Sequence, residues 1–419
     1  MTKVMIIGSG GRESALAWKL ADEGIDVFAY PGNPGILSIG KYADISGHFD
    51  SIKDYALDRS IDLVVIGPEQ YLADGLTDYL KEYNIDVFGP SSQAARIETD
   101  KAYAKKLMER KNVPTADCTV VESREEFDSE IKSRDYPYVV KVSGLAAGKG
   151  AYIIKSREEL DRAVDEIFNE NRFGDASGRI IIEQFMEGSE ASLFVITDSV
   201  KTVPMLPAQD FKRALDDDKG LNTGGMGSYA PCELVNEQVS SRIMNTIIKP
   251  VLEGLIEDGS PFRGLLYCGL MITEEGPKVV EFNARFGDPE TQSILPLMKD
   301  ELYPLLKQSA AGSLEIESIS FAPGAAVTVI IASEGYPGQY RKGGEIKIDH
   351  SSLDDNIEIF QAGTSLEDNK LIASGGRIIG ITATGRDLRE AVESVYSNIS
   401  GININNSFYR KDIGKRALK

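Results

Sequence analysis

The sequence predicts a three-domain protein of mixed α/β and α+β class, and three observations support this prediction. The chain has 419 residues, and at about 150 residues per domain this length fits roughly three domains. Residues 1–95 alternate apolar strand patterns with helical patterns, which is typical of a parallel sheet covered by helices. Beyond about residue 320 strand patterns dominate, with one helix. We therefore expect a small, β-rich C-terminal domain.

The first strand pattern, KVMIIG at residues 3–8, runs into the glycine turn GSGGRES at 8–14, before a helical pattern. A dinucleotide-binding turn has the pattern G-x-G-x-x-G, and the third glycine is absent because Glu13 stands there. A strand–glycine–helix turn still offers backbone N–H groups to an anion at the helix N-terminus, and Arg12 favours a phosphate. The alternative is a tight turn with no ligand.

A second glycine-rich stretch, KVSGLAAGKG at residues 141–150, lies between two strand patterns. It is not a Walker A loop, because that motif requires G-x-x-x-x-G-K-[ST] before a helix, whereas Lys149 precedes Gly150 and a strand. We interpret it as a lid at the tip of a hairpin. Successive backbone N–H groups can form an anion-binding nest, and Lys141 and Lys149 add cations. The alternative is a flexible hairpin turn.

A third candidate site is KVVEFNARFGDPE at residues 278–290. Glu281 and Asn283 are two residues apart on a predicted strand, so they point to one face. Carboxylate and amide oxygens are hard ligands, suited to magnesium held against substrate phosphates. Arg285 extends this face and could grip a carboxylate or an acyl phosphate. The alternative is an exposed polar face on an edge strand.

The composition narrows the classes of partner. The formal net charge of −19 repels phosphate backbones and anionic lipid, so we expect neither nucleic acid nor a membrane surface as a partner. An anionic substrate then requires local cations, backbone N–H groups or magnesium. No apolar run has transmembrane length, and the start lacks the apolar core of a signal peptide. Three scattered cysteines fit a reducing cytosol, so we expect a cytoplasmic protein.

Together these motifs resemble ATP-grasp ligases and, more closely, the phosphoribosylamine–glycine ligase family. The stretches that carry the resemblance are GSGGRESALAWKL (8–20), PGNPG (31–35), GPEQYLADGL (67–76), GPSSQAARIETDKAYAK (89–105), GLAAGKG (144–150), AQDFKRALDDDKGLNTGGMG (208–227), EFNARFGDPETQ (281–292), SEGYPG (333–338) and SGGRIIGITATG (374–385).

The resemblance implies a fold and a reaction. The fold would comprise a pre-ATP-grasp domain at residues 1–98, an ATP-grasp domain at 99–320 with a lid subdomain at about 115–190, and a β-rich domain at 321–419. The reaction would join glycine to 5-phosphoribosylamine through a glycyl phosphate and give glycinamide ribonucleotide, ADP and phosphate in purine biosynthesis. The partners would be small molecules, and we expect a monomer or a weak homo-oligomer.

The resemblance also implies roles for individual residues. Arg285, Lys149 and Asp210 would act in catalysis, with Arg285 steadying the glycine carboxylate. Glu281 and Asn283 would hold Mg²⁺ or Mn²⁺. The residues that would bind ATP are Lys101, Lys141, Gly144, Gly148, Lys149, Gly150, Glu183, Gln184, Phe185 and, on the ribose, Glu190. Those that would face phosphoribosylamine are Gly8, Gly10, Gly11, Arg12, Glu13, Gly67, Pro68, Glu69, Asn222, Gly224, Gly225, Met226 and Gly227.

The chain departs from the family pattern at four positions. The family usually has histidine where this chain has Ser14, Phe211 and Gln361, and aspartate where it has Ser143. Phe211 cannot form hydrogen bonds, so a polar role there is lost or moved, and Ser143 removes a charge beside the lid. The acidic run at residues 216–218 reads as a solvated loop rather than a metal site. Lys101 could also belong to a solvated helix face.

Three other functions stay open. The first is a biotin carboxylase-like or another purine carboxylase-like ATP-grasp enzyme, which the N-terminal motifs disfavour. The second is a nucleotide-binding regulatory protein without turnover, supported only by the changed residues Ser14, Ser143 and Phe211. The third is a dinucleotide-dependent oxidoreductase, disfavoured by the broken glycine pattern and the predicted magnesium strand.

Overall fold

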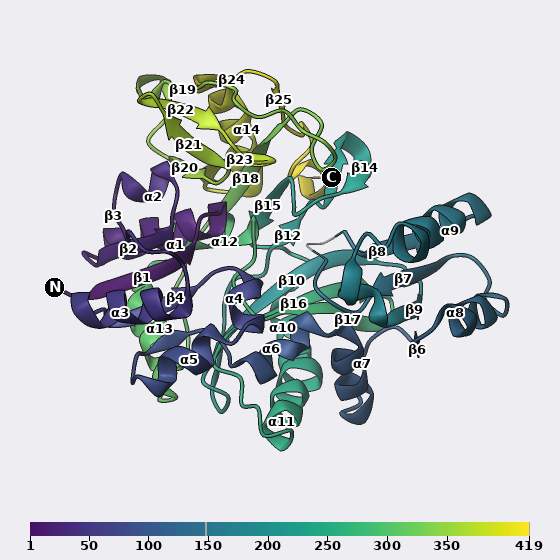
Figure 1. The fold of residues 1–419 in the computed structure, drawn as a ribbon. Coiled ribbons are helices and arrows are strands. Elements are labelled where there is room, and N and C mark those ends of the chain that lie inside the picture. The colour runs from purple at the N-terminus through teal and green to yellow at the C-terminus, as the bar shows by residue number, and fades with distance from the viewer. Residues whose placement is uncertain (147–148, 419) are drawn as a thin grey trace.

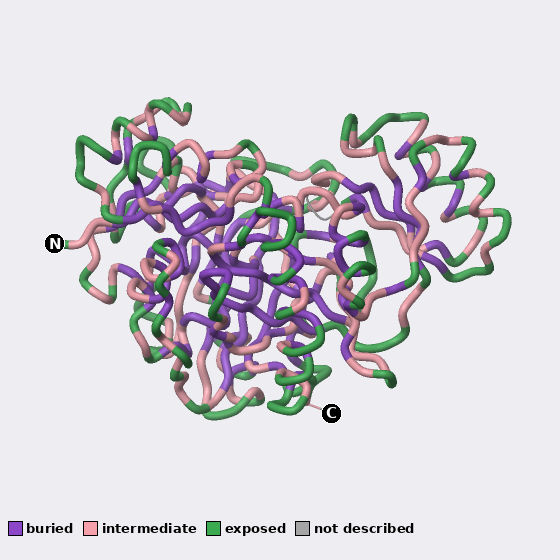
Figure 2. The backbone as a smooth tube through the Cα atoms, turned by 90° about the horizontal axis from the view of Figure 1, so that it is seen from below, coloured by how far each residue is buried: buried purple, intermediate pink, exposed green. Residues whose placement is uncertain are grey.

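The computed structural model describes residues 1–146 and 149–418, arranged as three regions and a projecting lobe (Figure 1). The N-terminal region lies at the left of Figure 1, the C-terminal region at the top, and the lobe of residues 118–184 at the right. Buried chain runs through the N-terminal and central regions, and the lobe has a separate buried patch (Figure 2). The predicted mixed α/β and α+β class is confirmed.

The N-terminal region is a five-stranded parallel sheet in the order β3-β2-β1-β4-β5. Its central strands are apolar along their whole length because helices cover both faces, and Val4 to Ile7 are fully buried. The strands are β1 (Lys3–Gly8), β2 (Asp26–Pro31), β3 (Lys41–Tyr42), β4 (Leu63–Ile66) and β5 (Val87–Phe88). The helices are α1 (Gly11–Asp22), α2 (Pro34–Leu37), α3 (Phe49–Arg59), α4 (Glu69–Ala73), α5 (Leu76–Glu82) and α6 (Ser92–Thr99).

The central region is built on an antiparallel sheet in the order β11-β10-β16-β17. The segments LLYCGLMIT and PKVVEFNAR form an antiparallel hairpin that turns at Glu274 and Glu275. The strands are β10 (Ser189–Thr197), β11 (Thr202–Pro204), β16 (Gly264–Thr273) and β17 (Gly276–Asn283). The helices are α7 (Lys101–Arg110), α10 (Glu237–Ile243), α11 (Lys249–Glu257), α12 (Glu290–Ile294) and α13 (Leu302–Ala311).

The projecting lobe is a four-stranded antiparallel sheet in the order β6-β9-β7-β8, with two helices. Its core is a cluster of its own around Phe127, Val140 and Ile182. The second helix of the lobe is capped by Ser156, whose side chain accepts a hydrogen bond from Glu159 N. The elements are β6 (Cys118–Val121), α8 (Arg124–Ile131), β7 (Tyr138–Val142), β8 (Ala151–Ile154), α9 (Arg157–Val164) and β9 (Ile180–Gln184).

The C-terminal sheet has the order β12-β15-β18-β23-β20, and β25 also pairs with β18. Two of its strands come from the central part of the sequence, so this sheet ties that part to the C-terminal region. The elements are β12 (Gln209–Asp210), β15 (Gly227–Ala230), β18 (Ala325–Ser333), β20 (Ile357–Gln361), β23 (Arg377–Gly385), α14 (Leu388–Asn398) and β25 (Ser407–Phe408).

Two-stranded sheets and short helical turns make up the remaining regular structure. Three two-stranded sheets pair β13 (Arg213–Leu215) with β14 (Lys219–Asn222), β19 (Ile346–Ile348) with β24 (Ile402–Ile404), and β21 (Thr364–Glu367) with β22 (Lys370–Ala373). Turns of 3-10 helix lie at Gly174–Gly178, Asp216–Asp218, Leu295–Leu297, His350–Ser352, Ile399–Gly401 and Lys415–Leu418, and π-helical turns at Asp165–Asn169 and Met244–Ile248. Within the described ranges, no helix has both the length and the apolar character needed to cross a membrane.

Candidate active site

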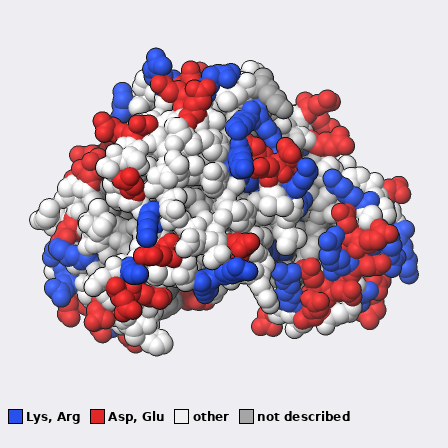
Figure 3. Space-filling view, turned by 90° about the horizontal axis from the view of Figure 1, so that it is seen from above, with Lys and Arg blue, Asp and Glu red and all other residues white. Residues whose placement is uncertain are grey.

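A large cleft of about 1490 Å³ lies where the three regions and the lobe meet. Its walls carry charged side chains from every part of the chain, including Arg12 from the N-terminal region, Lys141 from the lobe, Glu281 from the central sheet and Arg377 from the C-terminal sheet. The lining has more carboxylates than cationic side chains. On the molecular surface, basic and acidic side chains are intermixed in the same way (Figure 3).

Two lysines beside the cleft share one buried carboxylate. Lys141 on β7 and Lys105 on α7 contact the two oxygens of Glu183 on β9, with Nζ–Oε distances of 2.7 and 3.0 Å. All three side chains are nearly inaccessible. Burial favours the neutral acid, but Lys141 and Lys105 outweigh it and hold the pKa of Glu183 below its ordinary value. The triad therefore carries one net positive charge at a fixed place.

The predicted ATP contacts Glu183, Gln184 and Phe185 separate into two groups. The side chain of Glu183 turns toward the lysines, so its carboxylate is not free for a nucleotide. Gln184 and Phe185, the next two residues, line the cleft. A nucleotide base could therefore meet the chain here through Gln184 and Phe185.

Lys101 stands at the start of α7, where the central region meets the lobe. Its Nζ donates to the carbonyl oxygen of Gly144 at 3.2 Å, and burial lowers its pKa. It lines the cleft, so the alternative of a fully solvated helix face is wrong. Asp100 caps the helix, because its side chain accepts from Tyr103 N. The Ser143 hydroxyl donates to Asp100 and accepts from Ala102 N, each at 3.0 Å, which joins the lid strand to the helix.

The described residues of the predicted lid, 144–146 and 149–150, lie between strands β7 and β8. A Cβ on Gly144 would lie 2.7 Å from Ala176 Cα, so glycine is required for this close packing. Leu145, Ala146 and Gly150 line the cleft. Lys149 is not among the lining residues, and its Nζ donates instead to the carbonyl oxygen of Pro337 at 3.4 Å. Gly148 lies outside the described residues.

The predicted metal ligands Glu281 and Asn283 end strand β17 and both line the cleft. Burial favours the neutral acid at Glu281, but the nearby Lys212, Lys141 and Lys101 hold its pKa below the ordinary value. Among the described residues, no group of three or more His, Cys, Asp or Glu side chains is arranged to hold a metal ion. Two oxygen donors alone fit a cation that takes its remaining ligands from substrate phosphates and water.

Arg285 is fixed by two carboxylates before any substrate arrives. Its Nη2 lies 3.1 Å from Glu98 Oε1 and its Nε lies 3.3 Å from Glu69 Oε2. Burial lowers the pKa of the guanidinium, but Glu98 and Glu69 outweigh burial and raise it. Burial also raises the pKa of Glu98. The predicted GPE turn therefore reaches the site through Glu69, which orients Arg285.

In the GSGGRES turn, Glu13 organises the other residues. Its carboxylate accepts from Gly10 N and from Arg12 Nε, each at 2.6 Å, and Arg12 Nη1 donates to the carbonyl oxygen of Phe286. A Cβ on Gly67 would lie 1.9 Å from Glu13 Oε1, so glycine there makes room for this carboxylate. Gly10, Arg12, Glu13, Pro68 and Glu69 line the cleft, whereas Gly8, Gly11 and Gly67 lie behind it.

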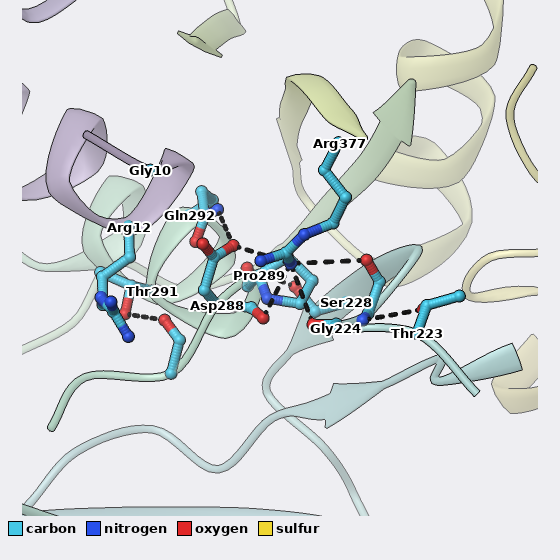
Figure 4. A network of polar contacts seen from close by, with 12 residues as sticks. Gly10, Arg12, Thr223, Gly224, Ser228, Asp288, Pro289, Thr291, Gln292 and Arg377 are labelled. Carbon is cyan, nitrogen blue, oxygen red and sulfur yellow. Dashed lines mark hydrogen bonds and ion pairs between the residues drawn. The ribbon is translucent and has the colours of Figure 1, made fainter. Parts of the chain in front are cut away.

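Arg377 joins the C-terminal sheet to the NTGGMG loop and to the turn before α12 (Figure 4). Its Nη1 donates to the carbonyl oxygens of Gly224 at 2.9 Å and Asp288 at 3.0 Å, and to Asp288 Oδ1 at 3.1 Å. Burial favours neutral Asp288, but Arg377 and Arg12 lower its pKa. Of the predicted loop residues, Asn222 and Gly224 line the cleft, whereas Gly225, Met226 and Gly227 do not.

A second group of charges surrounds Lys212, beside Asp210 on β12. Lys212 Nζ lies 3.2 Å from Glu190 Oε2 and 3.8 Å from Glu281 Oε1. Burial raises the pKa of Asp210 to about 7 against the opposing effect of Lys212, and Glu290 and Glu190 add to the rise. Asp210, Glu190 and Lys212 all line the cleft. Sequence reasoning named Asp210 and Glu190 but assigned no role to Lys212, Glu290, Asp288 or Arg377, although the motifs that carry the resemblance contain all four.

The residues that depart from the family pattern form contacts with groups close to them in space. Ser14 Oγ donates to the carbonyl oxygen of Gln361, and Asn33 Nδ2 donates to both, so two of the changed residues meet between the N-terminal and C-terminal regions. Phe211 is buried. The guanidinium groups of Arg410 and Arg416 lie 5.1 and 5.8 Å from its ring centroid, within the range of a cation–π contact.

Family models of known proteins match nearly the whole chain. Models of the phosphoribosylglycinamide synthetase N domain, ATP-grasp (A) domain and C domain match residues 2–98, 99–291 and 326–416. The fold and the cleft thus define an ATP-grasp protein. The chain belongs to the phosphoribosylglycinamide synthetase family, and the resemblance inferred from its motifs is confirmed.

Individual relatives agree with the family. The phosphoribosylamine–glycine ligase of Rhizobium meliloti is 41% identical over 421 residues, which cover 99% of both chains. The human trifunctional purine biosynthetic protein adenosine-3 is 42% identical over 99% of this chain, but the chain spans only 42% of that protein. The crystal structure of the Thermotoga maritima phosphoribosylamine–glycine ligase has a TM-score of 0.86 and 33% identity, and the match covers 98% of this chain and 100% of that one.

A biotin carboxylase domain of Hydrogenobacter thermophilus, solved with MgADP and bicarbonate, shares the fold. Its TM-score is 0.74 and its identity 19%, over 97% of this chain and 91% of that one. At this identity the likeness concerns the fold alone.

The buried lysine–glutamate triad gives a stability prediction. Glu183→Gln leaves Lys105 and Lys141 buried without a counter-charge, so we expect a loss of about 3–5 kcal/mol in the free energy of unfolding, measured by urea titration. The control is Asp161→Asn, which breaks the exposed pair with Arg157 in the same lobe and should cost less than about 1 kcal/mol. Equal small losses in both variants would contradict the assigned role of the triad.

Proposed function

We propose that this protein is an ATP-dependent ligase that joins glycine to 5-phosphoribosylamine and forms glycinamide ribonucleotide, ADP and phosphate in de novo purine biosynthesis. The observation that carries the proposal is the end-to-end match to the Rhizobium meliloti ligase, combined with a cleft that gathers the motif residues of every region. The substrates are small molecules. We propose a cytoplasmic location and a monomer or weak homo-oligomer.

The proposed chemistry has two steps. A carboxylate oxygen of glycine attacks the γ-phosphorus of ATP, the bond to ADP breaks, and glycyl phosphate forms. The amine of phosphoribosylamine then attacks the acyl carbon, loses a proton, and releases phosphate. Fixed positive groups stabilise the charge that shifts among the phosphate oxygens, and we assign this role to Lys101 and Lys141. No protein nucleophile is needed.

The nucleotide is proposed to lie between the lobe and the central sheet. The chain at Gln184 and Phe185 would meet the adenine, with Glu183 holding Lys141 from behind, and Glu190 would meet the ribose. The lid residues Gly144, Gly148, Lys149 and Gly150 would close over the phosphates. Closing a lid keeps water from a reactive acyl phosphate.

A divalent cation, Mg²⁺ or Mn²⁺, is proposed to bind with ATP at Glu281 and Asn283. The fit rests on the donor set, since both side chains line the cleft, and on the lowered pKa of Glu281, which keeps that carboxylate ionised. When bound, the cation would neutralise phosphate charge in a cleft that has more carboxylates than cationic side chains.

The acceptor side is proposed to lie between the N-terminal glycine turns and the 222–227 loop. Arg285, oriented by Glu69 and Glu98, would steady the glycine carboxylate. Asp210 would accept the proton that the attacking amine loses, because a carboxyl group with a pKa of about 7 is partly ionised at neutral pH. The residues proposed to face phosphoribosylamine are Gly8, Gly10, Gly11, Arg12, Glu13, Gly67, Pro68, Glu69, Asn222, Gly224, Gly225, Met226 and Gly227.

The domain boundaries are part of the proposal. We place an N-terminal domain at residues 1–98, the ATP-grasp domain at 99–320 with its lid at about 115–190, and the C-terminal domain at 321–419. The pairing of β15 with β18 crosses the second boundary, so the last two domains would move as one unit.

The function is tested by ADP release from the purified protein with ATP and Mg²⁺, omitting glycine and freshly generated phosphoribosylamine in turn. We expect release only when both are present, because an acyl phosphate without its acceptor stays in the closed cleft. Release that needs bicarbonate instead of glycine would point to a carboxylase-like enzyme. ATP binding without release under every combination would favour a regulatory protein, and tight NADH binding an oxidoreductase.

The metal assignment is tested by Glu281→Gln. This change removes a charged oxygen ligand, so we expect turnover at saturating ATP to fall at least about a hundredfold, because supporting a metal ion is worth several kcal/mol. The midpoint for Mg²⁺ activation should rise as well, while the circular dichroism spectrum stays unchanged. Glu274→Gln, at the exposed turn of the same hairpin, is the matched control. Near-normal turnover of Glu281→Gln would remove Glu281 from the metal site.

A further inference from the structure

The β13–β14 hairpin forms part of the acceptor side of the cleft. Lys212 precedes β13 and Thr223 follows β14, and both residues line the cleft. The hairpin has little apolar packing of its own, since Leu215 is 50% exposed and Leu221 60% exposed. At its tip, Asp217 and Asp218 adopt left-handed φ angles of 57° and 53°, which are uncommon for residues other than glycine although aspartate tolerates them better than most. Contacts from elsewhere help to hold this shape.

The C-terminal segment, residues 409–418, supplies these contacts through Arg410. The Arg410 side chain is completely buried, and its Nη1 lies 3.0 Å from Asp218 Oδ1 and donates to the carbonyl oxygen of Arg213 at 3.0 Å. Its Nε and Nη2 donate to the two carboxylate oxygens of Asp412 at 2.8 and 2.7 Å. This two-pronged geometry fixes the orientation of a guanidinium group. Arg410 thus touches the hairpin at its tip and at its first strand.

The main chain of the segment also binds the tip. Lys411 N donates to Asp216 Oδ1 at 2.8 Å, and Asp217 N donates to Asp412 Oδ2 at 2.9 Å. Arg416 forms an ion pair with Asp218 and lines the cleft. Each residue of the acidic run at 216–218 therefore has a partner in the segment, although Asp217 and Asp218 stay exposed to solvent as expected for a solvated loop.

The segment is itself anchored, so it can act as a support. Tyr396 on α14 donates its hydroxyl to the carbonyl oxygen of Arg410 at 2.9 Å and accepts from Ile413 N at 3.0 Å. Ile413 is fully buried. In Figure 1 the C-terminal end lies beside β14.

We propose that Arg410 and Arg416 are positioning residues that hold the β13–β14 hairpin, and through it Asn222 to Gly224, in place as the acceptor-side wall of the cleft. The effect on the substrate rests on the proposed function: the acceptor, phosphoribosylamine, is held by this wall, whereas ATP lies between the lobe and the central sheet. Loss of the support therefore weakens acceptor binding selectively. Phe211, beneath both guanidinium groups, couples the segment to β12 and Asp210.

The test is a double-mutant cycle on the partly exposed pair Arg416 and Asp218, where the variants are expected to fold. Arg416→Gln should raise hydrogen–deuterium exchange in peptides covering residues 213–222 and raise the KM for phosphoribosylamine about fivefold, with the KM for ATP unchanged. Arg416→Gln with Asp218→Asn should be no worse than the more severe single variant. Arg410→Gln, which removes the buried contacts, should have the larger effect on exchange.

The control is Arg386→Gln, which breaks an exposed ion pair with Glu390 on α14 and should change neither quantity. Unchanged exchange in the hairpin of Arg410→Gln and Arg416→Gln would overturn the proposal. Faster exchange throughout the protein, with both KM values raised alike, would also overturn it, because that result means a general loss of stability. Faster exchange confined to the hairpin, in a protein that shows no glycine-dependent ADP release, would support the positioning role and overturn the proposed function.

Discussion

The structure depends most on the burial of two lysines against one carboxylate. Lys105 lies on α7, and Lys141, 36 residues further along the chain, lies on β7. Both form ion pairs with Glu183. Burying an ammonium group without a partner is so costly that the group loses its proton. The carboxylate gives both ammonium groups a buried counter-charge and at the same time fixes β9 and β7 of the lobe against α7. This single interaction thus places cationic side chains at the proposed phosphate site and also attaches the lobe to the central region.

Carboxylates hold other cationic side chains around the cleft in the same way. Glu98 and Glu69 orient Arg285, Asp288 orients Arg377, and Glu190 contacts Lys212. Each cation is fixed before a substrate arrives, so little reorganisation is needed when phosphate charge shifts. The acids also leave the lining richer in carboxylates than in cations, in a chain whose net charge is −19. That balance explains why polyanionic substrates would enter together with a divalent cation.

Local patterns in the sequence predicted the elements well. Alternation in VVEFN put Glu281 and Asn283 on one face, and both side chains line the cleft. Contacts between distant segments were not predictable in this way. The hydrogen-bond partners of the Arg377 and Arg410 guanidinium groups are 89 or more residues away along the chain, apart from Asp412. The ion pair of Arg410 with Asp218 and those of Lys105 and Lys141 with Glu183 join segments that are far apart in the sequence, so no local pattern indicates them.

In the first step of the proposed reaction, a glycine carboxylate oxygen becomes bonded to the γ-phosphorus of ATP. Glycine labelled with ¹⁸O in both carboxylate oxygens tests this directly when the released phosphate is analysed by mass spectrometry after turnover with ATP, Mg²⁺ and phosphoribosylamine. We expect one ¹⁸O atom in each phosphate released, because the bond between the acyl carbon and the bridging oxygen breaks and this oxygen leaves with the phosphate. Phosphate that carries no label, although glycinamide ribonucleotide is formed, would contradict the glycyl phosphate route and the roles assigned to Lys101, Lys141 and Arg285.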